Sequence, residues 1–147
     1  MAGEARTAKK VYEATTLLAS AERLATAGTN GSAVRLPVAD AYAFVLDVTA
    51  AATDAADTLD VKVQALTDGT NWEDVAYFTQ CIGTGGAKRY IMKIAPGDVA
   101  QAEFEVGTAL TAGNVRHLTG DAWRVTWVIV DADADGAFTF SVTAIPM

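Results

Sequence analysis

The sequence contains few of the residues from which catalytic and metal sites are usually built. Its 147 residues include one cysteine, Cys81, and one histidine, His117. A single cysteine excludes an internal disulfide and a zinc site of paired cysteines, and we interpret Cys81 as a buried thiol. The sequence has no Gly-x-Ser-x-Gly motif, whose serine nucleophile would need His117 as a base. We therefore interpret this histidine as a loop or strand-edge residue. We therefore predict a protein that is not an enzyme and needs no cofactor.

Positive charge is also scarce. Eleven Lys and Arg residues stand against 18 Asp and Glu residues, and the formal net charge is -7. This charge opposes binding to a phosphate backbone, so we expect no nucleic acid partner. The acidic excess lies between residues 40 and 74, where eight acids accompany one base, Lys62. Apolar stretches long enough for a membrane-spanning helix and the apolar part of a secretion signal are both missing, so we expect no membrane partner.

What the sequence does contain is an alternation of apolar and polar residues. Hydrophobic residues make up 51% of the chain. From residue 15 onward they recur with a period of two, and turn signals recur about every ten residues, as in a β-sandwich or barrel. We predict an all-β fold: a jelly-roll-like antiparallel β-sandwich of about eight or nine strands. It is formed by residues 15–147 as a single domain, and residues 1–14 form an N-terminal arm.

The predicted strands follow from this alternation. The first is residues 17–26, closed by a glycine-containing turn at 28–31, with a helix as the alternative because Ala and Leu dominate there. The others are residues 42–49, a hairpin of 59–66 with 72–80 around a turn at 68–71, residues 90–94, and a closing hairpin of 123–129 with 138–144. Trp127 is predicted to face the core, and residues 98–117 show no clear pattern.

An acidic turn near the C-terminus is a weak candidate for a metal site. Asp131, Asp133, Asp135 and Gly136 match the first half of an EF-hand loop, in which alternate carboxylates surround a cation. The position that should provide a bidentate Glu is Val142, which the strand pattern places in the core. The pattern therefore favours a plain acidic turn over a calcium site.

Two other polar segments have structural interpretations. Asp54, Asp57 and Asp60 fall across a turn and the start of a strand, and we interpret them as solvated surface. The glycine-rich residues 83–88 lack the spacing of a phosphate-binding loop and are followed by no helix pattern. We predict a flexible loop between strands there.

Several segments of the sequence resemble small virion structural proteins of tailed bacteriophages. They are FVLDVTA at residues 44–50, TLDVKVQ at 58–64, DGTNWEDVAYFTQ at 68–80, RVTWVI at 124–129 and GAFTFSVTA at 136–144. The resemblance covers residues 32–145 and departs from the family at the acidic turn that precedes Gly136. It implies a protein that decorates or cements the capsid surface of the virion by binding the major capsid protein. It also implies assembly in the host cytoplasm and a homo-oligomer, with a trimer favoured.

The N-terminal arm is the candidate for contacts with the capsid or with another subunit. It combines cations with apolar side chains, a mixture suited to pairing with acids and filling an apolar groove on a neighbour. The candidate contact residues are Arg6, Lys9, Lys10, Val11 and Tyr12. A disordered terminus is the alternative.

A second virion role uses different residues. A tail or baseplate β-sandwich that binds carbohydrate or other virion proteins would use exposed aromatic rings, here Trp72 and Tyr77, as stacking platforms. A metal-dependent hydrolase ranks last, because scattered carboxylates and one histidine do not provide a set of metal ligands.

Deletion of residues 1–13 should leave the sandwich folded and weaken docking or oligomer formation, because the arm is predicted to lie outside the domain. Circular dichroism would check the fold, and sedimentation would check association. Association of the truncated protein at the level of the full chain would contradict the role of the arm.

Overall fold

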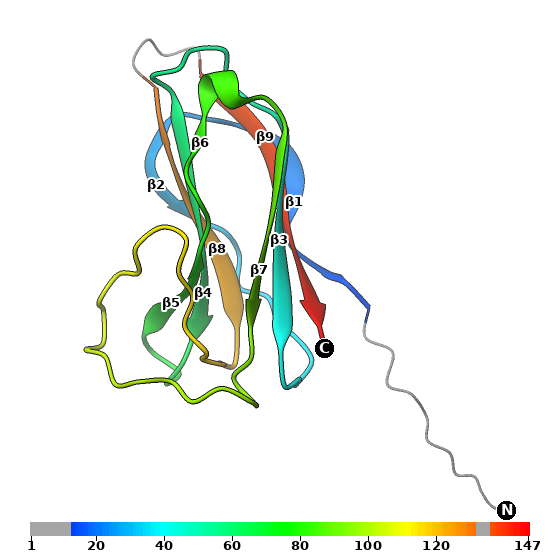
Figure 1. Cartoon of the computed structure of the whole chain (residues 1–147), viewed down its shortest axis with the longest axis vertical. Helices are drawn as coiled ribbons and strands as arrows, with labels where there is room; N and C mark the ends of the chain where they lie inside the picture. Colours follow the sequence, from blue (N-terminus) through cyan, green and yellow to red (C-terminus); the bar gives the residue numbers. More distant parts are fainter. Residues whose placement is uncertain (1–12, 132–135) are drawn as a thin grey trace, which may run out of the picture.

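The chain folds into two antiparallel β-sheets that pack face to face (Figure 1). The structure is a computed structural model, and it describes residues 13–131 and 136–147. One sheet has the strand order β1-β9-β3-β7, and the other has the order β2-β8-β4-β5, with β6 beside β4. The strands are β1 (Thr15–Leu24), β2 (Thr26–Asn30), β3 (Tyr42–Ala50), β4 (Thr58–Leu66), β5 (Trp72–Tyr77), β6 (Cys81–Ile82), β7 (Lys88–Ile94), β8 (Trp123–Val130) and β9 (Ala137–Pro146). The predicted all-β antiparallel sandwich is confirmed.

The strand pairings are nested. β1 pairs with β9, β2 with β8, β3 with β7, and β4 with β5, all antiparallel. The chain therefore behaves as one long double ribbon that is bent over on itself. Pairing of β3 with β9 and of β4 with β8 joins the bent ribbon into the two sheets. As a result, β1 and β2 lie in opposite sheets, and so do β8 and β9.

The nested pairing corrects two predictions. The hairpin of β4 and β5 is confirmed, but the closing hairpin of β8 and β9 is wrong, because each of these strands pairs within its own sheet. The predicted turn at residues 28–31 is also wrong: most of it belongs to β2, to which the chain crosses after Leu24. An inward-facing apolar alternation looks the same whether a chain returns in its own sheet or crosses to the facing one.

The core lies between the two sheets. β8 and β9 alternate between buried and more exposed positions, which puts Trp123 and Trp127 inside and confirms the prediction for Trp127. The Trp123 ring packs against Tyr42 and Phe44 of β3, with ring centroids 5.0 and 5.7 Å away. Such tilted aromatic contacts add to the free energy gained by burying the rings. This aromatic cluster joins the facing sheets.

Residues 98–117 form an irregular segment that is tied to the second sheet (Figure 1). Gly113 N–H donates to the Tyr77 carbonyl at 2.7 Å, and Arg116 N–H donates to the Val75 carbonyl at 2.9 Å. The segment therefore covers the free side of β5. At its end, His117 Nδ1 accepts a hydrogen bond from Ala95 N–H at 3.0 Å, which fits the predicted structural role of this histidine in a loop.

Trp123→Ala should reduce the free energy of unfolding by about 3 to 5 kcal/mol, because the ring is buried among two other aromatic rings. Trp72→Ala is the matched control. Trp72 is partly exposed at the start of β5, so we expect a loss of about 1 kcal/mol. Urea denaturation followed by fluorescence of the remaining tryptophans would measure both, and equal losses would contradict the assignment of Trp123 to the core.

Candidate binding groove

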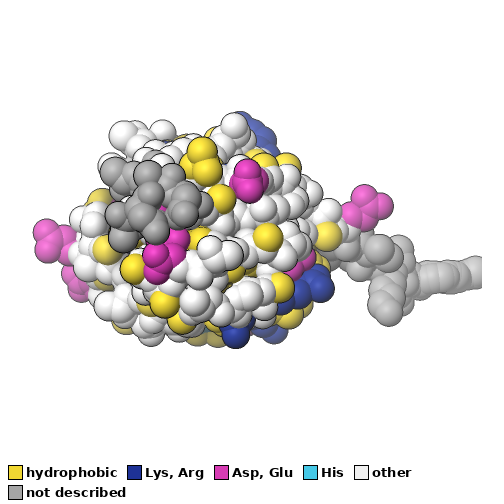
Figure 2. Space-filling model, turned by 90° about the horizontal axis from the view of Figure 1, so that it is seen from above, with side chains coloured by type: hydrophobic (Ala, Val, Ile, Leu, Met, Phe, Trp, Pro, Cys, Tyr) yellow, Lys and Arg dark blue, Asp and Glu magenta, His cyan; other side chains and the backbone are white. Residues whose placement is uncertain are grey.

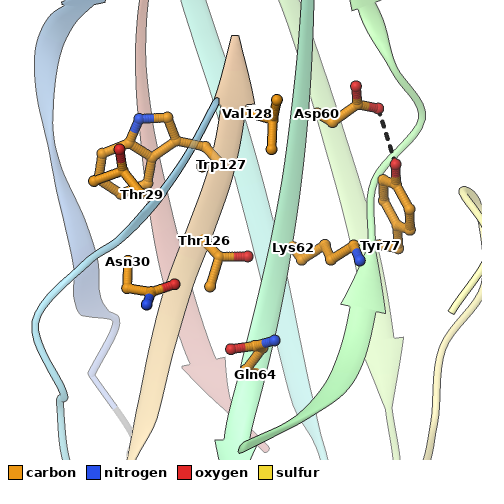
Figure 3. Close-up of a pocket in the computed structure, with 10 residues that line it drawn as sticks. Thr29, Asn30, Asp60, Lys62, Gln64, Tyr77, Thr126, Trp127 and Val128 are labelled. Atoms are coloured by element: carbon orange, nitrogen blue, oxygen red, sulfur yellow. Dashed lines mark hydrogen bonds between the residues drawn. The ribbon is translucent and has the colours of Figure 1, made fainter. Parts of the chain in front are cut away.

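A groove of about 310 Å³ opens on the outer face of the β2-β8-β4-β5 sheet (Figure 3). Strands β2, β4, β5 and β8 all contribute to its walls. Its lining residues are Gly28, Thr29, Asn30, Asp60, Lys62, Gln64, Tyr77, Thr126, Trp127 and Val128. Most of these side chains are polar, and the groove is open to solvent rather than enclosed.

The groove follows from the alternation of side chains along β4 and β8. Asp60, Lys62 and Gln64 occupy the outward positions of β4, between buried residues. On β8, Thr126 is paired with Lys62, and Val128 with Asp60. Thr126 and Val128 are short beside the long side chain of Lys62, and this difference in length leaves a hollow. β2 forms the far wall, and its pairing with β8 is interrupted by a register shift.

Hydrogen bonds fix the polar side chains at one end of the groove. Tyr77 Oη donates to Asp60 Oδ1 at 3.0 Å (Figure 3), and Gln80 Nε2 donates to Asp60 Oδ2 at 2.9 Å. Lys62 Nζ lies 4.7 Å from the centroid of the Tyr77 ring. Burial raises the pKa of the Tyr77 phenol, and the hydrogen bond to Asp60 and the charge of that carboxylate raise it further. The Tyr77 phenol is therefore a neutral hydrogen-bond donor over the physiological pH range.

The network continues along the sheet toward Trp72. Lys62 Nζ lies 3.2 Å from Asp74 Oδ2, and Gln64 Nε2 donates to Asp74 Oδ1 at 2.9 Å. Arg124 Nε donates to Gln64 Oε1 at 2.8 Å, and its guanidinium carbon lies 4.3 Å from the centroid of the Trp72 ring. The acids Asp60 and Asp74 thus alternate with the bases Lys62 and Arg124 across the outer face. Gln64 donates to Asp74 and accepts from Arg124, so both ends of its amide group are fixed.

Asp74 is the carboxylate that this network stabilises most clearly. Its burial acts to raise its pKa, but hydrogen bonds from Gln64, from Leu110 N–H and from Lys62, together with the charge of Lys62, outweigh burial. The pKa of Asp74 therefore lies below its ordinary value, and the group stays ionised near neutral pH.

The aromatic residues proposed from the sequence as stacking platforms have one ring face covered. Lys62 lies over Tyr77 and Arg124 lies over Trp72. Both rings are partly exposed, so a ligand would meet a ring edge or the second face. The groove offers a carboxylate, an amide, a hydroxyl and an aromatic edge, which are groups suited to holding a small polyol or sugar.

The acidic residues of the turn at 54–60 do not form the solvated cluster that we predicted. Asp57 is completely buried. Its N–H donates to the Asp54 carbonyl at 3.0 Å, and its carbonyl accepts from Gly83 N–H at 2.9 Å, so the turn directs Asp57 into the protein. A Cβ atom at Gly136 would lie 2.6 Å from Asp57 Oδ2, so a glycine allows this close approach. Asp60 lies in the groove instead.

The structure places the other candidate residues as follows. Asp131 accepts a hydrogen bond from Gly136 N–H at the end of β8, while Asp133 and Asp135 lie outside the described residues. The candidate contact residues of the arm, Arg6, Lys9, Lys10, Val11 and Tyr12, also lie outside them.

Two further predictions concern Cys81 and the glycine-rich loop. The prediction of a buried thiol at Cys81 is confirmed, and burial, followed by the charge of Asp60, raises the pKa of that thiol. The glycine-rich segment lies between β6 and β7, as predicted, but Gly83–Gly85 form a short 3-10 turn.

The groove itself was not predicted. A sequence signal exists in the polar outward positions of β4, but these read as an ordinary solvent face until the strands beside β4 are known. Residues 28–30, expected to be part of a turn, supply a wall of the groove because the chain crosses into the second sheet.

Within residues 13–131 and 136–147, no three His, Cys, Asp or Glu side chains gather in a way that could hold a metal ion. The same residues include no helix with the length and hydropathy needed to cross a membrane. Comparisons with protein-family models, with curated proteins and with solved structures find no match to this chain.

Asp74→Asn should remove a pH-dependent part of the stability. Because the folded state lowers the pKa of Asp74, its stabilising effect is present above the unfolded value of about 3.9 and disappears as the pH falls through the folded value. The difference in unfolding free energy between wild type and Asp74→Asn should therefore be constant near neutral pH and should shrink as the pH falls below about 4. Urea denaturation across a pH series would measure it, with Asp98→Asn as the control for loss of one exposed carboxylate. A difference that stays constant with pH would contradict the role of Asp74.

Proposed function

We propose that the protein is a non-enzymatic structural protein of a tailed-phage virion that decorates and cements the capsid shell by binding the major capsid protein. The observation that carries this proposal is the nested pairing of β1 with β9, β2 with β8, β3 with β7 and β4 with β5. We infer that this rolled ribbon is a jelly roll, an architecture that recurs in viral capsid proteins. The resemblance of the sequence to phage virion proteins supports the same role.

The chemistry of the described residues supports a binding protein more than an enzyme. His117 Nδ1 accepts a backbone hydrogen bond, and both oxygens of Asp60 accept side-chain hydrogen bonds. The raised pKa of Cys81 disfavours its thiolate, which is the nucleophilic form. The side chains of the types most often used in catalysis are thus held in structural contacts.

The distribution of apolar surface bears on how such a protein would dock. Figure 2 looks onto one end of the sandwich, where hydrophobic side chains are dispersed among polar ones. Dispersed apolar side chains are ordinary surface and do not mark a partner site. Ile91 differs from these dispersed side chains because it lies on the regular edge strand β7, where 68% of its surface is exposed. The proposed docking uses the side of the sandwich that carries β7. The resemblance to phage virion proteins implies a homo-oligomer, with a trimer favoured.

The copy number of the protein in purified particles tests this proposal. Quantitative mass spectrometry against the major capsid protein should give a ratio near one or near a fixed simple fraction. A few copies per particle would instead place the protein in the tail or at the portal vertex. Absence from the particle would contradict any virion role.

The groove favours a second candidate function, a tail or baseplate module that binds carbohydrate. Its supporting observation is the set of Asp60, Gln64 and Tyr77 around one hollow on an outer sheet face. If decoration is the function, Tyr77→Ala should leave binding to capsid shells within about twofold of wild type, since a surface substitution away from the contact changes little. If carbohydrate binding is the function, a glycan array should detect a ligand for the wild type, and Tyr77→Ala should abolish that signal.

A further inference from the structure

The edges of the two sheets differ in how well they are protected. The sheet orders leave four edge strands, β1 and β7 in one sheet and β2 and β5 in the other. An edge strand exposes backbone N–H and C=O groups that can pair with another chain, and proteins usually block such edges with bulges, charges or covering segments.

Three of the four edges are irregular, short or covered. β1 pairs with β9 through two register shifts, and at one of them Arg23 donates hydrogen bonds to the carbonyls of Ala19 and Phe140, both at 2.7 Å. β2 has five residues and a register shift of its own. β5 is covered by the segment that contains Gly113 and Arg116, which hydrogen-bonds to its backbone.

β7 is the regular and uncovered edge. Its seven residues pair with β3 in continuous register, from Ile94 opposite Tyr42 to Lys88 opposite Val48. Within the described part of the chain, no backbone hydrogen bond joins Lys88–Ile94 to any strand other than β3. The backbone groups that point away from β3 are therefore available to another strand.

The side chains of β7 indicate which kind of strand would fit. Lys88, Arg89 and Lys93 are all exposed, and none of them forms an ion pair with another described residue. Ile91 is exposed between them. Beside the start of the strand lies a hollow of about 310 Å³, lined in part by Thr49 and Arg89. Asp47 of β3, which also lines this hollow, lies opposite Arg89 in the strand ladder without forming an ion pair with it, so three cations stand against one acid along this edge. The edge thus combines free main-chain groups, an apolar centre and a net positive charge.

A second copy of β7 does not fit this edge in the symmetric register centred on Ile91. In an antiparallel pair centred on Ile91 with a twofold axis, Arg89 of each strand would lie opposite Lys93 of the other. Like charges directly opposite each other destabilise a strand pair. A strand with acidic residues at these positions would instead pair favourably with both cations.

We propose that β7 is a docking strand that receives an extended, acidic segment of a partner protein, which adds a strand to the β1-β9-β3-β7 sheet. Main-chain hydrogen bonds along β7 would provide affinity, and Arg89 and Lys93 would select the acidic sequence. The identity of the partner as the capsid shell rests on the proposed function, but the chemistry of the docking strand does not.

Charge reversal on β7 tests the inference with capsid shells as the probe. Shells that lack the protein are immobilised, and binding of the full chain is compared for wild type, Arg89→Glu, Lys93→Glu and Arg35→Glu. Arg35 is an exposed arginine in the segment before β3 and forms no ion pair with a described residue, so it is the matched control. We expect Arg89→Glu and Lys93→Glu to weaken binding by about tenfold or more, and Arg35→Glu to change it by less than about twofold. Circular dichroism would verify that each variant is folded.

Amide hydrogen exchange provides a second measurement that does not depend on the capsid. The wild-type chain is incubated with an eight-residue peptide that alternates Glu and Val, and separately with one that alternates Lys and Val. The acidic peptide should slow exchange at amides of β7, and the basic peptide should not. Equal effects of both peptides, or protection confined to other strands, would overturn the inference.

The two measurements separate the two proposals. If wild type binds shells and the β7 variants bind equally well, the docking strand is wrong and the decoration function stands. If wild type fails to bind shells but the acidic peptide protects β7, the docking strand stands and the decoration function is wrong. Binding of neither probe overturns both. Association of Arg89→Glu with wild type in sedimentation experiments, without an effect of the acidic peptide, would mean that a second copy occupies the edge.

Discussion

The period-two alternation along β4 is the constraint on which both faces of the second sheet depend. Leu59, Val61 and Val63 point inward and are buried, while the intervening residues point outward and line the groove. A slip of one residue in the pairing of β4 with β8 would exchange the two sets, exposing apolar side chains and burying Asp60 and Lys62. The cost of burying those charges fixes the register, so the core and the groove are specified together.

Charge is organised differently on the two sheets. On the outer face of β2-β8-β4-β5, Lys62 pairs with Asp74, and Arg124 binds Gln64 and covers Trp72. These cations are satisfied within the protein. On β7, by contrast, Lys88 and Lys93 lie opposite apolar residues of β3, Arg89 lies opposite Asp47, and none of the three cations forms an ion pair with a described residue, although the whole chain carries a net charge of -7. Unpaired cations on an acidic protein mark the place where an acidic partner meets the least repulsion.

The sequence predicted those parts of the fold that local chemistry determines. Asp68 accepts hydrogen bonds from the N–H groups of Thr70 and Asn71, which is the side-chain chemistry that makes the turn between β4 and β5 recognisable. The crossings between sheets were missed, since β8 and β9 carry the same inward alternation that a hairpin would carry. The groove and the burial of Asp57 depend on contacts between segments distant in the sequence, so composition and spacing contain little sign of them.

The positive charge of β7 can prevent pairing between copies of this strand and still leave the strand able to bind a partner. A regular edge of seven residues with an exposed Ile91 would aggregate by self-pairing if nothing opposed it. Bulges protect β1 and β2, but a bulge in β7 would also destroy the continuous backbone that a partner strand needs. Charge blocks self-pairing without altering the backbone, because Arg89 and Lys93 repel their own copies and attract acids. Protection by charge is therefore the form of edge protection that leaves β7 able to bind a different protein.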